Sequence, residues 1–120
     1  MSSGKPASLP VNPAWEVHPT QVHEALARHD DLLLLDVRRQ NEWDASHLPS
    51  ATLIPLDQLP ARAAELAPWK TRPIVVHCHH GVRSLNATAL LRKLGFTNVH
   101  SMAGGIEAWS LLVDPSIPRY

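Results

Sequence analysis

Two short runs of apolar residues most restrict the folds available to this chain. The segments LLLLDV (32–37) and PIVVHC (73–78) are continuously apolar until they reach Asp36 and His77, respectively. Runs of this length without alternating polarity are typical of strands that are buried on both faces, as in parallel sheets covered by helices. The chain is therefore expected to fold around a buried parallel sheet.

Helical patterns separate the apolar runs. One helix is expected after Pro19 and another over residues 56–66, where Pro60 should delay or kink the start. A third helix is expected from Arg83 to Gly95. Further short strands are expected at 15–19, 51–55 and 98–102, and a short helix at 104–109. This alternation predicts an α/β class with right-handed connections between parallel strands.

The length and composition fit one small globular domain. Of the 120 residues, 1–14 are expected to form a flexible leader, 15–112 the domain, and 113–120 a C-terminal tail. The 11 basic and 11 acidic residues balance, so neither nucleic acid nor a membrane is an expected partner. A single cysteine, with no secretory signal and no long apolar stretch, indicates a cytoplasmic location.

The segment CHHGVRS (78–84) lies where a strand, a loop and a helix meet. Gly81 can take a positive φ, and such a turn can point several N–H groups at the Cys78 sulfur. A free thiol with a pKa of about 8.5 is only roughly 3% ionised at pH 7. A helix N-terminus changes this by about one pKa unit at most. We therefore expect several hydrogen bonds to sulfur and a reactive Cys78 thiolate.

Two neighbouring features of the loop bear on its ligands. An arginine in the first turn of a helix opposes the helix dipole, which indicates that Arg83 contacts anions. A metal site made from His77, Cys78, His79 and His80 is not expected, because consecutive residues at a strand end point in alternating directions.

Three co-linear motifs resemble those of the rhodanese domains. The loop 78–84 fits the pattern C-x-x-G-x-R-[ST], LLDVRRQNEWDASHLPSATLIPL (34–56) resembles a second family segment, and LGFTNVHSMAGGIEAW (94–109) resembles the closing one. Together they extend over about residues 15–110. The resemblance implies a rhodanese fold, with a five-stranded parallel sheet flanked by helices on both faces.

The resemblance also implies a chemistry. Cys78 would take the outer sulfur of thiosulfate or a related donor, hold it as a persulfide, and pass it to cyanide or a thiol, with no cofactor and no metal. A partner protein is a further possible acceptor. The expected site has catalytic Cys78 and Arg83, substrate contacts from His79, His80, Gly81, Val82 and Ser84, and support from Asp36 and Arg38.

Two departures from the family pattern concern the site's surroundings. Ser46 and Ser50 stand where glycines usually flank a histidine, so strain is expected in the 43–51 loop if those positions need a positive φ. His79 and His80 stand where a fixed cation is common in thiosulfate-active members. Because histidines lose their charge near neutral pH, affinity for a dianionic donor is expected to weaken as the pH rises.

Two other functions remain open. A phosphatase or an arsenate reductase is the first alternative, because the cell-cycle dual-specificity phosphatases share this fold and a Cys…Arg loop. Their loops have five residues between cysteine and arginine, whereas this chain has four. An arsenate reductase also needs a resolving cysteine. A partner-binding module or persulfide carrier is the second alternative, although binding modules of this kind typically lack the cysteine.

Overall fold

The computed structural model describes residues 9–120. The first eight residues of the expected leader therefore lie outside the described part of the chain. The elements in chain order are β1 (Glu16–Val17), α1 (Pro19–Ala27), β2 (Leu33–Asp36), α2 (Gln40–Ala45), β3 (Thr52–Leu53), η2 (Leu56–Gln58), α3 (Leu59–Arg62), η3 (Ala63–Trp69), β4 (Ile74–His77), α4 (Val82–Lys93), β5 (Val99–Met102) and α5 (Gly105–Leu112).

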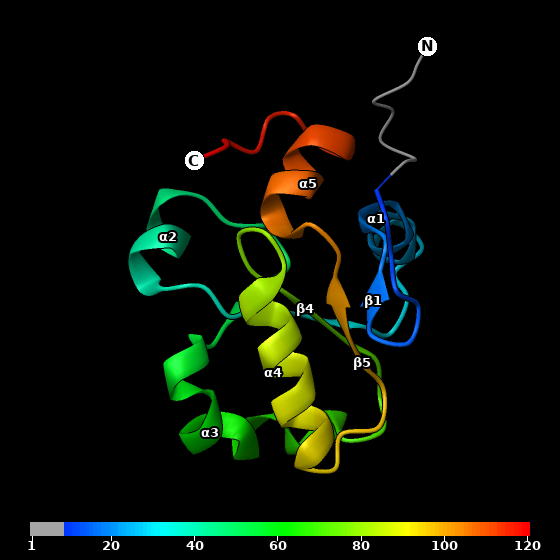
Figure 1. Ribbon diagram of the computed structural model, residues 1–120, viewed down its shortest axis with the longest axis vertical. Helices are drawn as coiled ribbons and strands as arrows, with labels where there is room; N and C mark the ends of the chain where they lie inside the picture. The colour runs from blue at the N-terminus through cyan, green and yellow to red at the C-terminus, as the bar shows by residue number, and fades with distance from the viewer. Residues whose placement is uncertain (1–8) are drawn as a thin grey trace.

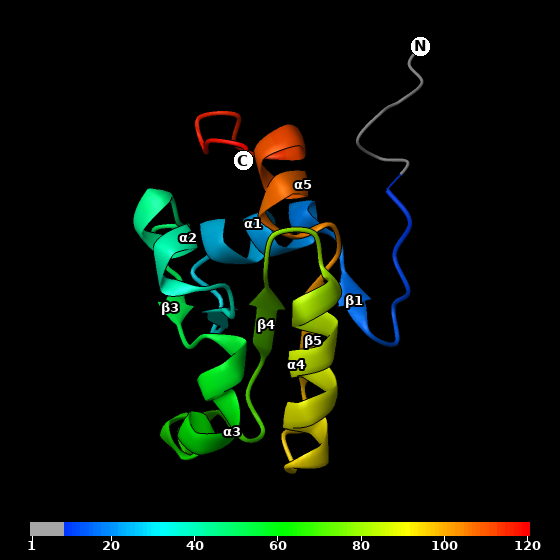
Figure 2. The same ribbon diagram turned by 60° about the vertical axis from the view of Figure 1, so that its left-hand side comes forward.

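The five strands form one parallel sheet in the order β1-β5-β4-β2-β3. Strand β4 is central, with β2 and β5 as its hydrogen-bonded neighbours (Figures 1 and 2). The predicted five-stranded parallel sheet is thus confirmed. Its topology places the residue after β4 at the middle of the sheet's carboxyl edge, where α/β folds bind ligands.

Side chains of the central strands alternate between two apolar cores. Ile74 and Val76 of β4 belong to the core formed with α3, η3 and α4, whereas Val75 belongs to the core formed with α1 and α5. In β2, Leu35 and Leu34 divide in the same way. Both faces of the sheet are therefore covered by helices, which explains why these strands read as continuous apolar runs.

The segment 56–66 is not the continuous helix expected from its sequence. Only Leu59–Arg62 is α-helical, between the 3₁₀ segments η2 and η3. Pro60 stands in the first turn of α3, where the missing N–H costs nothing, and Pro68 lies inside η3. The two prolines thus confine the α-helical hydrogen bonds to a single short stretch.

The loop after α2 does not carry the expected backbone strain. Ser46 has a φ of −172°, which is extended backbone, and among the described residues His29 is the only non-glycine with positive φ. The strain prediction for Ser46 and Ser50 is therefore wrong, because neither position needs the left-handed conformation. No helix in residues 9–120 combines the length and apolarity needed to cross a membrane.

Candidate active site

Cys78 follows the central strand β4, and its sulfur is enclosed by polar groups of the next loop. The residue is 1% exposed. The N–H groups of Gly81 and Ser84 donate to Sγ at 3.1 and 3.3 Å, and the thiol lies 3.4 Å from the Ser84 hydroxyl, to which it donates. Two inward-facing amides are thus available to stabilise negative charge on sulfur.

The shape of this loop depends on two glycines. Gly81 has a φ of 109° and directly precedes α4, so the chain turns back beneath the sulfur. Gly105, at the start of α5, lies so close to the loop that an added Cβ would overlap the carbonyl oxygens of Cys78 and His79. The N–H of Ile106 donates to Cys78 O at 2.8 Å, which anchors the loop to α5.

Ser84 links the sulfur to the neighbouring strand. Its hydroxyl donates to Gly81 O at 3.1 Å and lies 2.7 Å from the hydroxyl of Ser101 on β5. Ser84 and Ser101 are both fully buried. The hydroxyl pair therefore fixes the first turn of α4 against the sheet, directly beside Cys78.

Arg83 has a carboxylate partner that the sequence did not indicate. Its two terminal nitrogens donate to Glu42 of α2 at 2.6 and 2.9 Å. This hydrogen bonding is the main reason that the pKa of Glu42 lies far below its usual range, and it raises the pKa of Arg83. In the free protein, the charge expected to attract anions is thus balanced by Glu42.

A buried ion pair supports the edge of the sheet next to the loop. Asp36 and Arg38 are both completely buried and are joined by hydrogen bonds of 2.8–3.0 Å. Arg38 also donates to Ser46 O at 2.7 Å, so the pair holds the loop after α2. His77, beside Asp36 on β4, is also buried, and burial lowers the pKa of its imidazole to about 4. His77 is therefore neutral at physiological pH.

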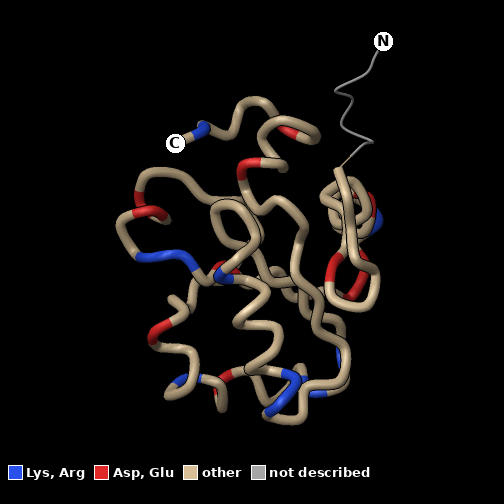
Figure 3. Tube along the Cα trace, in the orientation of Figure 1, with Lys and Arg blue, Asp and Glu red and all other residues tan. Residues whose placement is uncertain are grey.

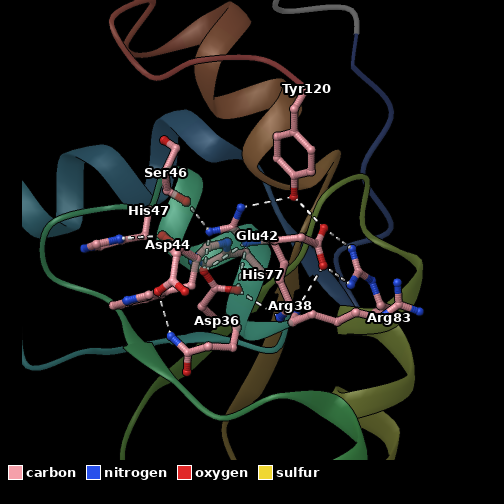
Figure 4. Close-up of polar contacts among 12 residues, drawn as sticks. Asp36, Arg38, Glu42, Asp44, Ser46, His47, His77, Arg83 and Tyr120 are labelled. Carbon is pink, nitrogen blue, oxygen red and sulfur yellow. Dashed lines mark hydrogen bonds and ion pairs between the residues drawn. The ribbon is translucent and has the colours of Figure 1, made fainter.

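The C-terminal tail reaches this network through Tyr120. Its hydroxyl donates to Glu42 at 2.7 Å and accepts from Arg38 at 3.0 Å, as Figure 4 shows. The Tyr120 ring stacks on His79 with a centroid separation of 3.9 Å. Tyr120 thus joins the Cys78 loop, the buried ion pair and α2, a role that no local sequence pattern indicated.

The remaining loop residues differ in their placement. The rings of His79 and His80 stack with centroids 3.9 Å apart. The pKa of His79 is lowered, chiefly by burial and secondly by the nearby His80. A charged His79 near neutral pH is therefore disfavoured. Val82, the first residue of α4, is 69% exposed.

A cavity of about 430 Å³ borders the loop through Arg83. Arg39 is a second basic residue in the lining of this cavity, and sequence reasoning missed it. Elsewhere, positions of both charge signs are distributed along the trace (Figure 3). Any attraction for an anion is therefore local. The cavity is lined by Val37, Arg39, Pro55, Leu56, Asp57 and Arg83.

Comparison with known sequences identifies the family. The sequence profile of the Rhodanese-like domain matches residues 18–112, most of the chain. This chain belongs to the rhodanese-like domain family. The match extends from the residue before α1 to the last residue of α5, so it includes the Cys78 loop and both cores.

Several relatives of this rhodanese-like domain have about the same length. A sulfurtransferase of Allochromatium vinosum is 34% identical over 79% of this chain and 87% of its own. The thiosulfate sulfurtransferase GlpE of Coxiella burnetii is 30% identical over 80% and 79%. The human single-domain sulfurtransferase TSTD1 superposes with a TM-score of 0.69 and 30% identity, over 78% and 93%. In other curated relatives, the chain spans only 26–31% of the relative's length.

Proposed function

We propose that this rhodanese-like domain is a sulfurtransferase that carries sulfur as a persulfide on Cys78. The observation that carries the proposal is the enclosure of Sγ by the amides of Gly81 and Ser84 at 3.1 and 3.3 Å. These two N–H groups are placed to hydrogen-bond to the attacking thiolate, which is the nucleophilic form of cysteine. Similarity to relatives named sulfurtransferases over most of both chains supports the same reading.

The proposed first step is a displacement at sulfur. The Cys78 thiolate attacks the outer sulfur of thiosulfate or a related sulfane donor, and a new S–S bond forms. The donor's S–S bond breaks, and sulfite leaves with the bonding electron pair. Atoms and charge balance without a metal, an oxidant or a proton transfer. Splitting the transfer into two displacements predicts ping-pong kinetics.

The second step needs an acceptor from outside the chain, because Cys78 is the only cysteine. Cyanide or a small thiolate attacks the terminal sulfur and restores the Cys78 thiolate, giving thiocyanate or a new persulfide. A protein thiol is an alternative acceptor. This chain spans under a third of the length of some relatives, so in those proteins the matching part is joined to other segments. That arrangement supports a protein partner as acceptor.

Arg83 and Arg39 are proposed to receive the anionic donor. Both line the cavity beside the loop. Glu42 neutralises Arg83 in the free protein, and Asp57 lines the same cavity. A dianionic donor therefore gains from Arg39 and from any shift of Glu42 that frees Arg83. Gly81 and Ser84 act through their backbone amides, while Asp36 and Arg38 hold the loop that follows α2.

Mass spectrometry of the intact protein after incubation with thiosulfate tests the proposal. The expected result is an added mass of about 32 Da, equivalent to one sulfur atom, on a cysteine nucleophile. Cyanide should remove this mass and form thiocyanate, and Cys78→Ser should give neither product. No adduct on the wild-type protein with any sulfane donor, or hydrolysis of an aryl phosphate that requires Cys78, would overturn it.

A further inference from the structure

His79, His80 and Glu107 bring together three side chains of the types that bind transition metals. Each offers one nitrogen or oxygen atom, and these atoms all lie within 4.8 Å of one another. We propose that this cluster binds a divalent transition-metal ion of the zinc type. The proposal does not rest on sulfur transfer, because the ligand set excludes the Cys78 sulfur.

Backbone hydrogen bonds hold Glu107 of α5 next to the loop that carries His79 and His80. The N–H of Glu107 donates to His79 O at 3.1 Å, next to the Ile106–Cys78 hydrogen bond of 2.8 Å. This close approach of α5 to the loop is possible because Gly105 has no side chain there. The carboxylate is therefore delivered to the histidines by fixed backbone contacts.

The two imidazoles lie side by side, one stacked on the other. Their centroids are 3.9 Å apart, and the planes differ by 22°. His79 and His80 lie in the loop after β4, so they do not alternate in direction as consecutive strand residues do. His79 Nε2 is buried and has no hydrogen-bond partner among the described residues. A buried ring nitrogen without a partner is costly, and an ion would satisfy it.

The carboxylate of Glu107 keeps one oxygen for the ion. Arg119 contacts Oε2 through both Nε, at 2.8 Å, and a terminal nitrogen, at 2.6 Å. No hydrogen bond from Arg119 to Oε1 occurs in the described part of the chain. Arg119 thus orients the carboxylate through Oε2 and leaves Oε1 without a hydrogen bond from its guanidinium.

The donor set selects the class of ion. Two imidazoles and one carboxylate suit zinc, nickel or cobalt, whereas magnesium and calcium prefer oxygen ligands. Tetrahedral zinc with bonds of about 2.0–2.1 Å places its ligand atoms roughly 3.3 Å apart. The atoms must therefore approach one another by up to about 1.5 Å. The exposed His80 ring must also turn out of the stack, because nitrogen lone pairs lie in the ring plane and those of two stacked rings cannot meet at one ion. Water would fill the fourth position, as in other three-ligand zinc sites.

Calorimetric titration of the full chain with zinc chloride tests the site. The expected result is one ion per chain, with affinity reduced at least tenfold in both His80→Ala and Glu107→Gln. His29→Asn is the matched control, because it removes an exposed histidine at a φ of 58° that asparagine tolerates. Equal affinity in the wild type and both ligand variants, or no measurable binding, would overturn the proposal.

Two further variants separate this site from its neighbours. Arg119→Ala removes the same ion pair as Glu107→Gln but keeps the ligand, so it should bind zinc at least as tightly as the wild type. Cys78→Ser should also retain binding, and imidazole NMR signals of His79 and His80 should shift with one equivalent of zinc. Loss of binding in Cys78→Ser with retention in His80→Ala would assign the ion to the thiol instead.

Discussion

Glu42 on α2 holds Arg83 on α4 through two hydrogen bonds, at 2.6 and 2.9 Å, although the residues are 41 positions apart. The Glu42 side chain is only 13% exposed and that of Arg83 29%. This contact joins the first turn of the helix that follows the Cys78 loop to the segment carrying Arg38 and Arg39. It therefore contributes both to the shape of the site and to its charge.

The first prediction concerns the pH dependence of this pair. Because the pKa of Glu42 is lowered in the folded protein, the unfolded chain binds more protons as the pH falls below about 4.5, the ordinary value. The stabilisation that the Glu42–Arg83 pair gives to the folded protein is thus complete at neutral pH and is lost progressively as the pH falls below about 4.5. Glu42→Gln should lower the free energy of unfolding by about 1–2 kcal/mol at pH 7.

Urea unfolding of both proteins from pH 7 to pH 3 measures this contribution. The difference in free energy of unfolding between the wild type and Glu42→Gln should shrink as the pH falls below about 4.5, the ordinary pKa of glutamate. Glu65→Gln serves as the control, since the Glu65–Arg62 pair is exposed and should contribute little. A difference for Glu42→Gln that stays constant down to pH 3 would contradict the assignment.

The second prediction concerns the hydroxyl beside the sulfur. Ser84→Ala removes the Oγ that lies 3.4 Å from Cys78 Sγ but leaves the Ser84 amide in place. A Cys78 thiolate can only accept, so the Ser84 hydroxyl, which donates to Gly81 O in the free protein, must turn to donate to sulfur. We expect the loss of this hydrogen bond to lower kcat/KM for sulfur transfer about tenfold, equivalent to about 1.4 kcal/mol. Steady-state thiocyanate formation measures it.

Ser101→Ala provides the comparison for Ser84→Ala. It removes the partner at 2.7 Å from Ser84 Oγ without touching the sulfur. Its effect on kcat/KM should therefore be smaller than that of Ser84→Ala. If both variants lose activity equally, the hydroxyl pair acts by packing α4 against β5 rather than through Cys78.

Much of this site follows from short-range sequence patterns. The apolar run 73–78 predicts a buried strand, and a parallel sheet places the next residue, Cys78, at its carboxyl edge. Gly81 before a helical period predicts the left-handed turn, and the structure gives it a φ of 109°. Each of these inferences uses residues within one turn or one strand, where local geometry limits the possibilities.

The contacts that sequence reasoning missed join distant segments. Arg38 and Tyr120 are 82 positions apart, and the Glu42–Arg83 pair depends on how α2 lies against α4. No periodicity specifies such pairs, because they arise only after the loops have packed. Ser46 shows the opposite error, since a glycine in a family pattern suggested positive φ where the backbone is extended.

The third prediction concerns Gly105. Any side chain there would overlap the carbonyl oxygens of Cys78 and His79, and the residue has a φ of +61°. Gly105→Ala should therefore lower the free energy of unfolding by well over 1 kcal/mol and abolish sulfur transfer. Thermal unfolding and thiocyanate formation measure the two effects.

Comparison with Gly95→Ala separates two possible effects of Gly105→Ala, the steric overlap of the new side chain and the backbone strain of a positive φ. Gly95 also has a positive φ, +97°, but its nearest neighbour is the flexible end of Lys70 at 3.4 Å. This variant should be moderately destabilised and keep its activity. If Gly95→Ala and Gly105→Ala behave alike, positive φ accounts for both, and the close approach of α5 to the loop is unimportant.

The last prediction concerns Tyr120, which holds the tail against the active-site network. Tyr120→Phe keeps the ring that stacks on His79 but removes the hydroxyl bonded to Arg38 and Glu42. We expect a loss of about 0.5–1.5 kcal/mol in the free energy of unfolding, because the Arg38 guanidinium loses an acceptor. Tyr120→Ala should cost more, since it also removes the stacking contact.

Hydrogen exchange shows where the loss occurs. In Tyr120→Phe, faster exchange is expected in the segments around Arg38 and Glu42, whereas the far end of α4 should be unchanged. In Tyr120→Ala, the segment containing His79 should also exchange faster, because its ring loses the aromatic neighbour at 3.9 Å. Wild-type stability and exchange in both variants would mean that the tail rests on the domain without contributing to the site.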